Sequence, residues 1–340
     1  MRVTPSCDSI NSFYISNASG VQLSPDIAFG GGYYFAVWSD NRAGYYQIYG
    51  ARITTSGTVL DPNGILIGPS SGAYYYYPSI IFNGNNFLVI WSVNTTPYRV
   101  MGRFVNPNGS FASDTLRLAN ASNYVYRVRH TFSGSNYLVC WAEYSPATYT
   151  YSVKGQIVSN TGVPVGSPFN IADSVQYTAL SVRWAVNNYL VAFSRRVGSI
   201  YQICGRFINT SGQPVGGIFN ISNNSYNCYY NDLYMGSGNR FLNVWSEYRT
   251  NNYDIYGNLD LVIGVEENKP DERTYSGLRS TVITKTIEFS NAEINGEIYD
   301  VSGKLIGNLE NGRYDCSKLN AGIYFVRTDK GERFKFVKIK

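Results

Sequence analysis

The chain of 340 residues contains five copies of one sequence unit, and this repeat limits the possible fold more than any other feature. Each copy places an aromatic residue in an apolar segment, as in FAVWSD, FLVIWS, YLVCWA, YLVAFS and FLNVWS. Successive aromatic residues are 50 to 53 positions apart; they are Trp38, Trp91, Trp141, Phe193 and Trp245. About ten residues later each copy has a glycine within a second strand-like segment, at Gly50, Gly102, Gly155, Gly205 and Gly257.

Turn residues divide each copy into short strands. A segment such as PDIAF or PSIIF precedes the aromatic strand and is joined to it by a glycine- or asparagine-rich turn. Four copies then continue with TTSG, NPNG, SNTG or NTSG and a final segment such as FNIA or FNIS. Four short antiparallel strands in about 52 residues are typical of a β-propeller blade. The sequence therefore predicts an all-β protein that begins with a five-bladed β-propeller.

The fifth copy stops at Leu259 and Asp260 without a fourth strand. SFYIS, at residues 12–16, matches PFNIA at 168–172 and IFNIS at 218–222. We expect this N-terminal segment to complete the fifth blade and close the ring, because a free sheet edge promotes aggregation. The predicted domains are a propeller over 1–264, a linker over 265–279 and a small Ig-like β-sandwich over 280–340.

Composition excludes several classes of function. The net charge of +5 includes no block of Lys or Arg, which argues against nucleic-acid binding. No window approaches the roughly 18 apolar residues of a membrane helix. His130 is the only histidine, which argues against a catalytic triad or a zinc site, and its place in a strand predicts an ordinary structural residue. Phosphate-binding and EF-hand motifs are missing, so we expect neither a cofactor nor a metal.

The last fifth of the chain resembles a known family. EIYDVSGKLI and DCSKLNAGIYFVRTDKGERFKFVKIK are similar to the type A sorting domain of the type IX secretion system. The residues that match its motifs are Tyr299, Asp300, Ser302, Gly303, Lys304, Asp315, Ser317, Leu319, Gly322, Ile323 and Tyr324. The resemblance implies that the secretion machinery is a partner, and that the protein crosses the outer membrane of a Gram-negative bacterium to be released or anchored at the surface.

Two features depart from this pattern. The Pro-Asn-Pro opening of the family is missing near Tyr275, and MRVTPSCDSI at the amino terminus lacks the apolar core of a signal peptide. Because such cargo first enters the periplasm, we expect the start of the protein to be incomplete in this chain.

Acidic residues recur two positions after the aromatic residue, at Asp40, Glu143 and Glu247. Arg42 and Arg249 lie close to two of them in the sequence. One interpretation is an acid–base pair that fixes the end of the strand and recurs because the blades are duplicates. Contact with a metal or with sugar hydroxyls is a second. Paired carboxylates of a glycosidase are a third and make these acids weak catalytic candidates.

Many of the 31 tyrosines lie in two sets of connections that open on the same face of a propeller. Counting back from the aromatic residue aligns Tyr76, Tyr126 and Tyr230, and likewise Tyr75, Tyr177 and Tyr229. Rigid amphipathic rings suit contact surfaces, and beside polar groups they suit sugars. We therefore predict a ligand-binding face made of Tyr75, Tyr76, Tyr126, Tyr177, Tyr229, Tyr230, Arg42 and Arg249. The alternative is that these rings only pack blade against blade.

The sequence thus favours a secreted or cell-surface binding module for a glycan or protein ligand. A polysaccharide-active enzyme with paired carboxylates and a purely structural adhesion protein are the alternatives. Because propellers have many activities, the predicted fold does not choose among these functions.

Overall fold

A computed structural model describes two compact units, Met1–Val265 and Glu266–Lys340, which we call unit 1 and unit 2. The described residues are 2–3, 9–69, 74–222, 225–236, 240–249, 252–261, 282–283, 286–289, 293–300, 303–320, 322–331 and 333–338. The predicted linker over 265–279 lies outside these ranges.

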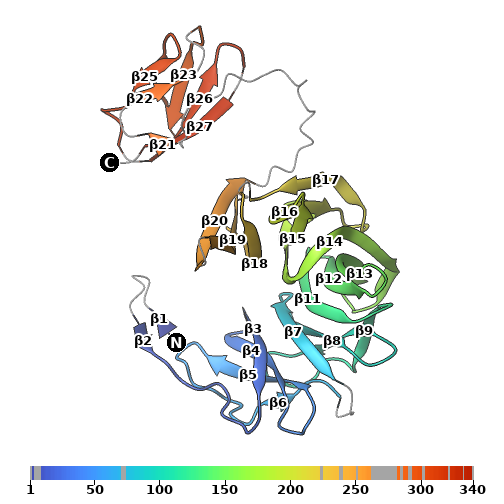
Figure 1. The fold of residues 1–340 in the computed structure, drawn as a ribbon. Coiled ribbons are helices and arrows are strands. Elements are labelled where there is room, and N and C mark those ends of the chain that lie inside the picture. Colours follow the sequence, from blue (N-terminus) through green and yellow to red (C-terminus); the bar gives the residue numbers. More distant parts are fainter. Residues whose placement is uncertain are drawn as a thin grey trace. The chain divides into compact units, whose positions relative to one another are not determined.

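Unit 1 is built from antiparallel blades, which we number 1 to 5 in chain order (Figure 1). Blade 1 comprises β3 (Gln22–Gly30), β4 (Tyr33–Asp40), β5 (Gln47–Thr54) and β6 (Ile65–Leu66). Blade 2 comprises β7 (Tyr75–Phe82), β8 (Phe87–Val93), β9 (Arg99–Val105) and β10 (Leu116–Asn120). The strand order in both blades follows the chain, as predicted from the repeat.

Blades 3 and 4 share one long strand. Blade 3 contains β11 (Val125–Phe132), β12 (Asn136–Ser145), β13 (Thr150–Ser159) and the first part of β14 (Pro164–Ala185). The first part of β14 pairs with β13, and its last part pairs with β15 (Asn188–Val197) as the first strand of blade 4. Blade 4 continues with β16 (Ile200–Ile208) and β17 (Pro214–Asn220).

Blade 5 has three strands, β18 (Asn227–Met235), β19 (Arg240–Arg249) and β20 (Asn252–Leu261). Residues 12–16 lie outside the strands, after the short β1 (Arg2–Val3) and β2 (Ser9–Asn11), so the prediction that they complete blade 5 is wrong for this structure. This segment directly precedes blade 1 in the chain, so it can pair with β20 only if blade 1 lies against blade 5. In Figure 1 the arc of blades is open between blades 5 and 1.

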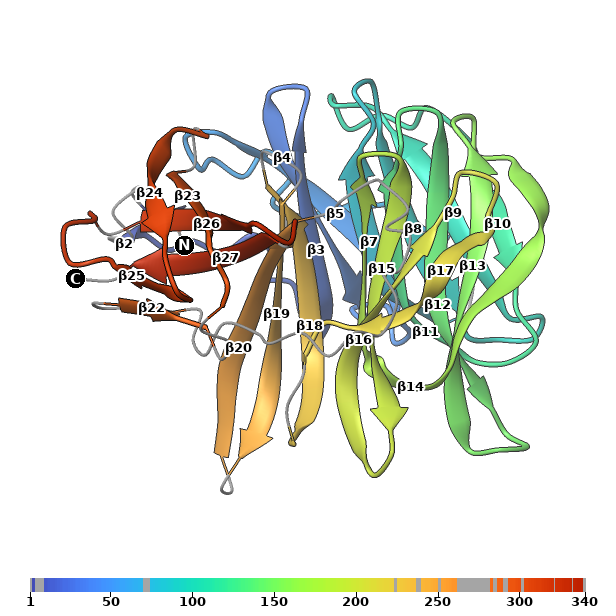
Figure 2. The same cartoon turned by 90° about the horizontal axis from the view of Figure 1, so that it is seen from above.

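The first strands of successive blades lie beside one another at the centre of the arc, in the order β3, β7, β11, β14 and β18. Seen from above, the strands of unit 1 run in roughly the same or opposite directions (Figure 2). One buried apolar cluster joins each blade to the next, from blade 1 to blade 5. Nearly all large buried side chains of unit 1 therefore lie between sheets rather than within a single one.

The repeated glycine of the third strand makes room for a side chain of the fourth strand. A Cβ on Gly155 would lie 2.8 Å from the ring of Phe169, and one on Gly205 would lie 2.5 Å from the ring of Phe219. Such distances are far inside van der Waals contact, so the glycine recurs because a ring lies against its backbone.

Unit 2 contains a five-stranded sheet in the order β21-β27-β26-β23-β24 and a two-stranded sheet of β22 and β25. The bounds are β21 (Val282–Ile283), β22 (Thr286–Glu288), β23 (Gly296–Asp300), β24 (Leu305–Leu309), β25 (Arg313–Asp315), β26 (Gly322–Thr328) and β27 (Arg333–Lys338). A separate apolar cluster that includes Ile287, Ile298 and Phe336 lies in this unit. Within the described residues, no helix is long and apolar enough to span a membrane.

Candidate functional site

The three recurring carboxylates accept hydrogen bonds from the tryptophans of their own strands. The indole Nε1 of Trp38 donates to Asp40 at 2.9 Å, that of Trp141 to Glu143 at 2.9 Å, and that of Trp245 to Glu247 at 3.3 Å. Residues two apart in a strand point to the same side, which places each acid beside its indole. Asp40 and Glu247 are fully buried, and Glu143 is 8% exposed.

Arg42 and Arg249 are held by the same carboxylates. Arg42 donates from Nε and Nη2 to the two oxygens of Asp40, at 2.9 and 2.6 Å, and also contacts the carbonyl oxygen of Asn63. Arg249 donates to Glu247, and its guanidinium lies over the rings of Tyr226 and Tyr256 at 4.7 and 4.2 Å. This geometry matches the interpretation of acid–base pairs that fix a strand end.

Blade 2 shows the indole without the acid. Blade 2 has Val93 at the acidic position, and Trp91 Nε1 is buried there without a hydrogen-bond partner.

Burial alone would raise the pKa of Asp40, but the hydrogen bonds from Arg42 and Trp38 outweigh it and hold the pKa below its ordinary value. Asp40 is therefore ionised at neutral pH.

The tyrosines of the two sets of connections contact each other. In each case a ring from the hairpin between the second and third strands lies against a ring at the start of a following blade. The centroid distances are 5.0 Å for Tyr46–Tyr76, 4.8 Å for Tyr98–Tyr124 and 6.5 Å for Tyr201–Tyr229. A further contact, Tyr77–Tyr126 at 6.1 Å, joins blade 2 to blade 3. The aromatic residues thus form a continuous surface across several blades.

A cavity of about 490 Å³ lies on this surface between blades 2 and 3. Its lining comprises Tyr74, Tyr76, Tyr77, Asn94, Thr95, Tyr124 and Tyr126. Tyr74 and Tyr124 are 45% and 44% exposed, and Tyr76, Tyr77 and Tyr126 are half-buried. Burial raises the pKa of Tyr76, so its hydroxyl stays neutral at physiological pH. We call this cavity and its lining the tyrosine pocket.

Some of the residues predicted for the binding face lie elsewhere. Tyr75 is 3% exposed and packs edge-on against Trp91 inside the core, which corrects its assignment as a ligand contact. Tyr177 has a described backbone, but its side chain lies outside the described part of the chain.

The alignment of Tyr230 is also corrected. Tyr76, Tyr126 and Tyr229 pair with the residue after the tryptophan in their respective blades, so Tyr229 is the true equivalent of Tyr76. Counting back from the tryptophan failed because the hairpin of blade 5 is longer: Met235 pairs with Phe241, whereas Phe82 pairs with Phe87. Tyr230 is 57% exposed and follows this position with a left-handed backbone, as Tyr77 follows Tyr76.

Sequence reasoning missed a ring of polar residues on the central strands. In each blade, one polar residue of the first strand pairs with the second-strand residue that directly precedes the tryptophan, or Phe193 in blade 4. These polar residues are Asp26, Ser79, Arg129, Ser181 and Asp232. Asp26, Ser79, Arg129 and Asp232 also line a central cavity of about 340 Å³ together with Arg183. Aligning the first strands by register would have found this pattern, because all five members are polar.

His130 belongs to the structural framework, as predicted. It is 2% exposed within β11, with Nδ1 3.2 Å from Ser79 Oγ and Nε2 3.1 Å from the carbonyl oxygen of Leu88. Burial lowers its pKa to about 3, so the ring is neutral. Within the described ranges, His, Cys, Asp and Glu form no group suited to a metal ion.

The sorting-motif residues surround the β23–β24 hairpin and β26. Gly303 has a φ of 82° and donates its N–H to the carbonyl of Asp300, while the Lys304 N–H donates to the Asp300 side chain at 3.1 Å. Tyr324, two residues after Gly322, stacks on Phe336 in the core with the ring centroids 5.4 Å apart. Tyr299 donates its hydroxyl to Glu297, and Ser302 lies outside the described residues.

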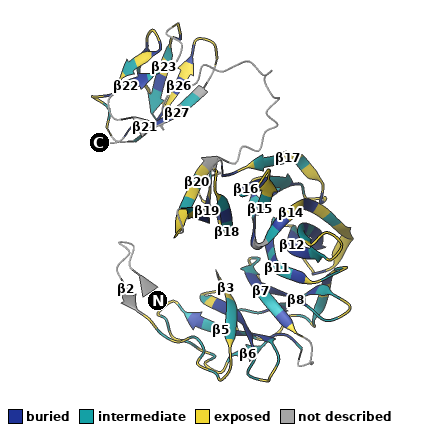
Figure 3. Ribbon diagram, in the orientation of Figure 1, coloured by how far each residue is buried: buried dark blue, intermediate teal, exposed yellow. Residues whose placement is uncertain are grey.

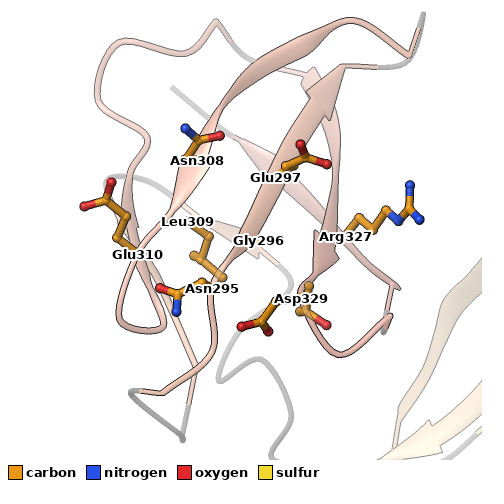
Figure 4. Close-up of a pocket in the computed structure, with 9 residues that line it drawn as sticks. Asn295, Gly296, Glu297, Asn308, Leu309, Glu310, Arg327 and Asp329 are labelled. Atoms are coloured by element: carbon orange, nitrogen blue, oxygen red, sulfur yellow. The ribbon is translucent and has the colours of Figure 1, made fainter.

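A shallow cavity of about 600 Å³ lies at the other end of these strands (Figure 4). Its charged side chains, Glu297, Glu310, Arg327 and Asp329, come from β23, β24 and β26 or directly follow them. Its lining is mostly exposed, and Gly296 lies in its floor beside the backbone of Arg327.

Comparisons with known proteins give two findings and one negative result. Residues 282–339 match the family model described as a secretion system C-terminal sorting domain. The chain is also similar to solved structures of glycoside hydrolases. An endo-arabinanase of glycoside hydrolase family 43 from Bacillus licheniformis is 14% identical, with 73% of this chain and 96% of that chain covered and a TM-score of 0.41. No curated protein matches the chain.

Two further structures have similar values. An endo-arabinase from Bacteroides thetaiotaomicron is 12% identical, with 75% of this chain and 99% of that chain covered and a TM-score of 0.44. A sucrose-6-phosphate hydrolase from Lactobacillus gasseri is 9% identical, with 94% and 86% covered and a TM-score of 0.43. Likeness at this level concerns architecture and assigns no reaction. The C-terminal match does assign a destination: residues 282–339 form a type IX secretion sorting domain, and the protein is secreted or attached to the outer surface.

Proposed function

We propose that unit 1 is a carbohydrate-binding module that works outside the cell through the tyrosine pocket. The observation that carries this proposal is the convergence of five tyrosine rings with Asn94 and Thr95 around one cavity of about 490 Å³. Tyrosine faces stack on the C–H faces of sugar rings, while their hydroxyls exchange hydrogen bonds with sugar hydroxyls. Among the described residues, the lining of the pocket includes no carboxylate and no arginine, which favours a neutral sugar.

The rings of the pocket are held in place before any ligand arrives. Tyr74 stacks on Tyr76 at 6.2 Å with an interplanar angle of 5°, and Tyr76 in turn contacts Tyr46 and Tyr77. A side chain whose rotamer is already fixed by its neighbours loses little entropy on binding. The contacts therefore support an aromatic platform that is ready to bind.

The positions of the recurring acids also favour binding over hydrolysis. Asp40, Glu143 and Glu247 each accept a hydrogen bond from a buried indole, and Asp40 and Glu247 are paired with arginines as well. A glycosidase acid or nucleophile must reach the scissile bond. We propose that these three carboxylates are structural and that Arg42 and Arg249 share that role.

The proposal is tested by replacing the two most exposed rings of the pocket, Tyr74→Ala with Tyr124→Ala. Loss of each aromatic contact costs about 1 kcal/mol or more. The double variant should therefore bind a soluble neutral oligosaccharide about 30-fold more weakly, by isothermal titration of the full chain. Tyr14→Ala is the matched control, because Tyr14 is 84% exposed and lies on the N-terminal segment. Equal affinity of the double variant and the control would contradict the proposal.

A second candidate function, hydrolysis of a polysaccharide, is favoured by one observation. The central cavity is lined by two carboxylates, Asp26 and Asp232, in addition to two arginines. Asp26 accepts hydrogen bonds from the N–H groups of Ile27 and Ile80, each at 3.0 Å, whereas the Asp232 side chain is 71% exposed. Release of reducing sugar from polysaccharides such as arabinan tests this function. If Asp26→Asn and Asp232→Asn each lower the rate of sugar release by several powers of ten, the result would support hydrolysis and contradict the binding proposal.

A further inference from the structure

The central cavity of about 340 Å³ is lined by two arginines from neighbouring strands, Arg129 of β11 and Arg183 of β14. Half-buried positions occur along β3, β7 and β11, three of the strands that line it (Figure 3). Its volume lies at the lower end of the range for small-molecule sites. The described lining residues of this cavity and of the tyrosine pocket do not overlap, so the two are separate features of unit 1.

Each of the two guanidinium groups is fixed by a hydrogen bond to its own strand. Arg129 Nη1 donates to the carbonyl oxygen of Val128 at 3.0 Å, and Arg183 Nη1 donates to that of Val182 at 2.8 Å. Among the described residues, no carboxylate forms an ion pair with Arg129. Because an arginine has five N–H groups, both side chains keep donors for a ligand after these bonds are made.

The two carboxylates of the cavity compensate these charges only in part. Asp26 accepts two backbone N–H groups, each at 3.0 Å. Asp232 lies 3.6 Å from Arg183 Nη2, and its side chain is 71% exposed. An ion pair of this length and exposure is screened by water and contributes little. An anionic ligand can therefore compete for the arginines.

A third arginine adds to the positive charge around the cavity. Burial lowers the pKa of Arg127, the charge of Arg129 lowers it further, and Asp232 opposes this effect. Burial is likewise the main cause of the low pKa of His130, and the charges of Arg129 and Arg183 add to it. The like charges are thus close enough to repel one another, and a bound anion would relieve that repulsion.

We infer that the central cavity binds an acidic sugar of the uronic acid class, with its carboxylate held by Arg129 and Arg183. The planar guanidinium matches a carboxylate with two parallel hydrogen bonds, which are stronger than bonds between neutral groups. Phe29 and Phe82 line the same cavity and supply apolar faces for the sugar ring. This site goes beyond the proposed function and does not rest on it, because the tyrosine pocket is not involved.

Isothermal titration of the full chain with D-glucuronate tests the ligand class. D-glucose has the same ring without the carboxylate, and acetate has the carboxylate without the ring. Both should bind at least tenfold more weakly than D-glucuronate, because each lacks one half of the recognised chemistry. Binding of D-glucuronate that is no tighter than that of D-glucose, or no tighter than that of acetate, would overturn the inference.

Substitution of one arginine tests the site itself. Arg129→Gln removes the charge and should weaken D-glucuronate binding about tenfold or more, since hydrogen bonds to charged groups are lost. Arg129→Lys restores the charge without the planar fork and should recover part of the affinity. Arg117→Gln is the matched control, because Arg117 is exposed on β10, and it should bind as the wild type does. Equal affinity of Arg129→Gln and this control would contradict the site.

Asp232→Asn gives a result that misfolding cannot imitate. Without this carboxylate, Arg183 has no competing partner in the cavity wall, so D-glucuronate should bind about twofold to fivefold more tightly. Asparagine keeps an oxygen for the Leu233 N–H, which the aspartate accepts at 2.8 Å. Unchanged or weaker binding would overturn the inference. The Tyr74→Ala and Tyr124→Ala double variant should bind D-glucuronate like the wild type, which separates failure of this site from failure of the tyrosine pocket.

Discussion

Stability between about pH 8 and about pH 5 should depend on a single side chain. His130 is the only histidine, and burial lowers its pKa from 6.5 to about 3, against the opposing effect of its hydrogen bond with the Leu88 carbonyl. In the unfolded chain the imidazole takes up a proton below about pH 6.5, whereas the folded protein does not. The free energy of unfolding is therefore highest above the pKa of the unfolded chain, where the ring is neutral in both states, and it falls as the pH falls below that value. With these two pKa values, the free energy of unfolding should fall by about 2 kcal/mol over this range.

Urea denaturation followed by tryptophan fluorescence measures this loss in unit 1. The five tryptophans are Trp38, Trp91, Trp141, Trp184 and Trp245, all within its bounds. His130→Val is the matched variant, because Ile80 and Val182 occupy the same register position in neighbouring blades. The variant should have nearly constant stability over the same pH range. Equal pH dependence in both proteins, or none in either, would refute the assignment of a buried neutral histidine.

Three further predictions concern the framework and the destination. Asp40→Asn should lower the free energy of unfolding, measured by urea denaturation, by about 3 kcal/mol, because it leaves buried partners of an ion pair unmatched. Asp114 is exposed, so Asp114→Asn is the control, and an equal loss in both variants would argue against the pair. Gly205→Ala should cost about 1–3 kcal/mol through overlap with a ring 2.5 Å away. Gly217→Ala has open space around its Cβ and should be neutral, so similar melting temperatures of the two variants would count against this packing. Removing residues 265–340 should leave the tryptophan fluorescence native and abolish surface delivery in a type IX-competent host, which surface immunolabelling detects; continued delivery would refute the sorting role.

The repeat predicted the blades well because strand period and turn chemistry are local properties. Segments such as FLVIWS and NPNG specify a strand and a turn wherever they occur, so the order of strands within a blade followed from the sequence. Pairing between distant segments is not local. Residues 12–16 resemble a fourth strand, but whether they pair with β20 depends on how blade 1 meets blade 5.

The site was predicted in part for the same reason. The sequence indicated that two sets of tyrosines share one face, and the contact between Tyr46 and Tyr76 shows that they do. It did not show that Tyr75 turns inward, because a run of four tyrosines has no period by which to assign faces. The indole donors to the carboxylates were within reach of sequence reasoning, since tryptophan and an acid two residues later occur together in three blades.

Binding of the full-length protein to a panel of neutral and acidic polysaccharides tests the central claim most directly. The panel is probed with the wild type, with the Tyr74→Ala and Tyr124→Ala double variant, and with the Tyr14→Ala control. If the tyrosine pocket binds carbohydrate, the wild type and the control should bind at least one neutral polysaccharide, and the double variant should not bind that polysaccharide. Retention of the double variant at wild-type level, or no retention of the wild type on any polysaccharide, would contradict a carbohydrate-binding function for this surface.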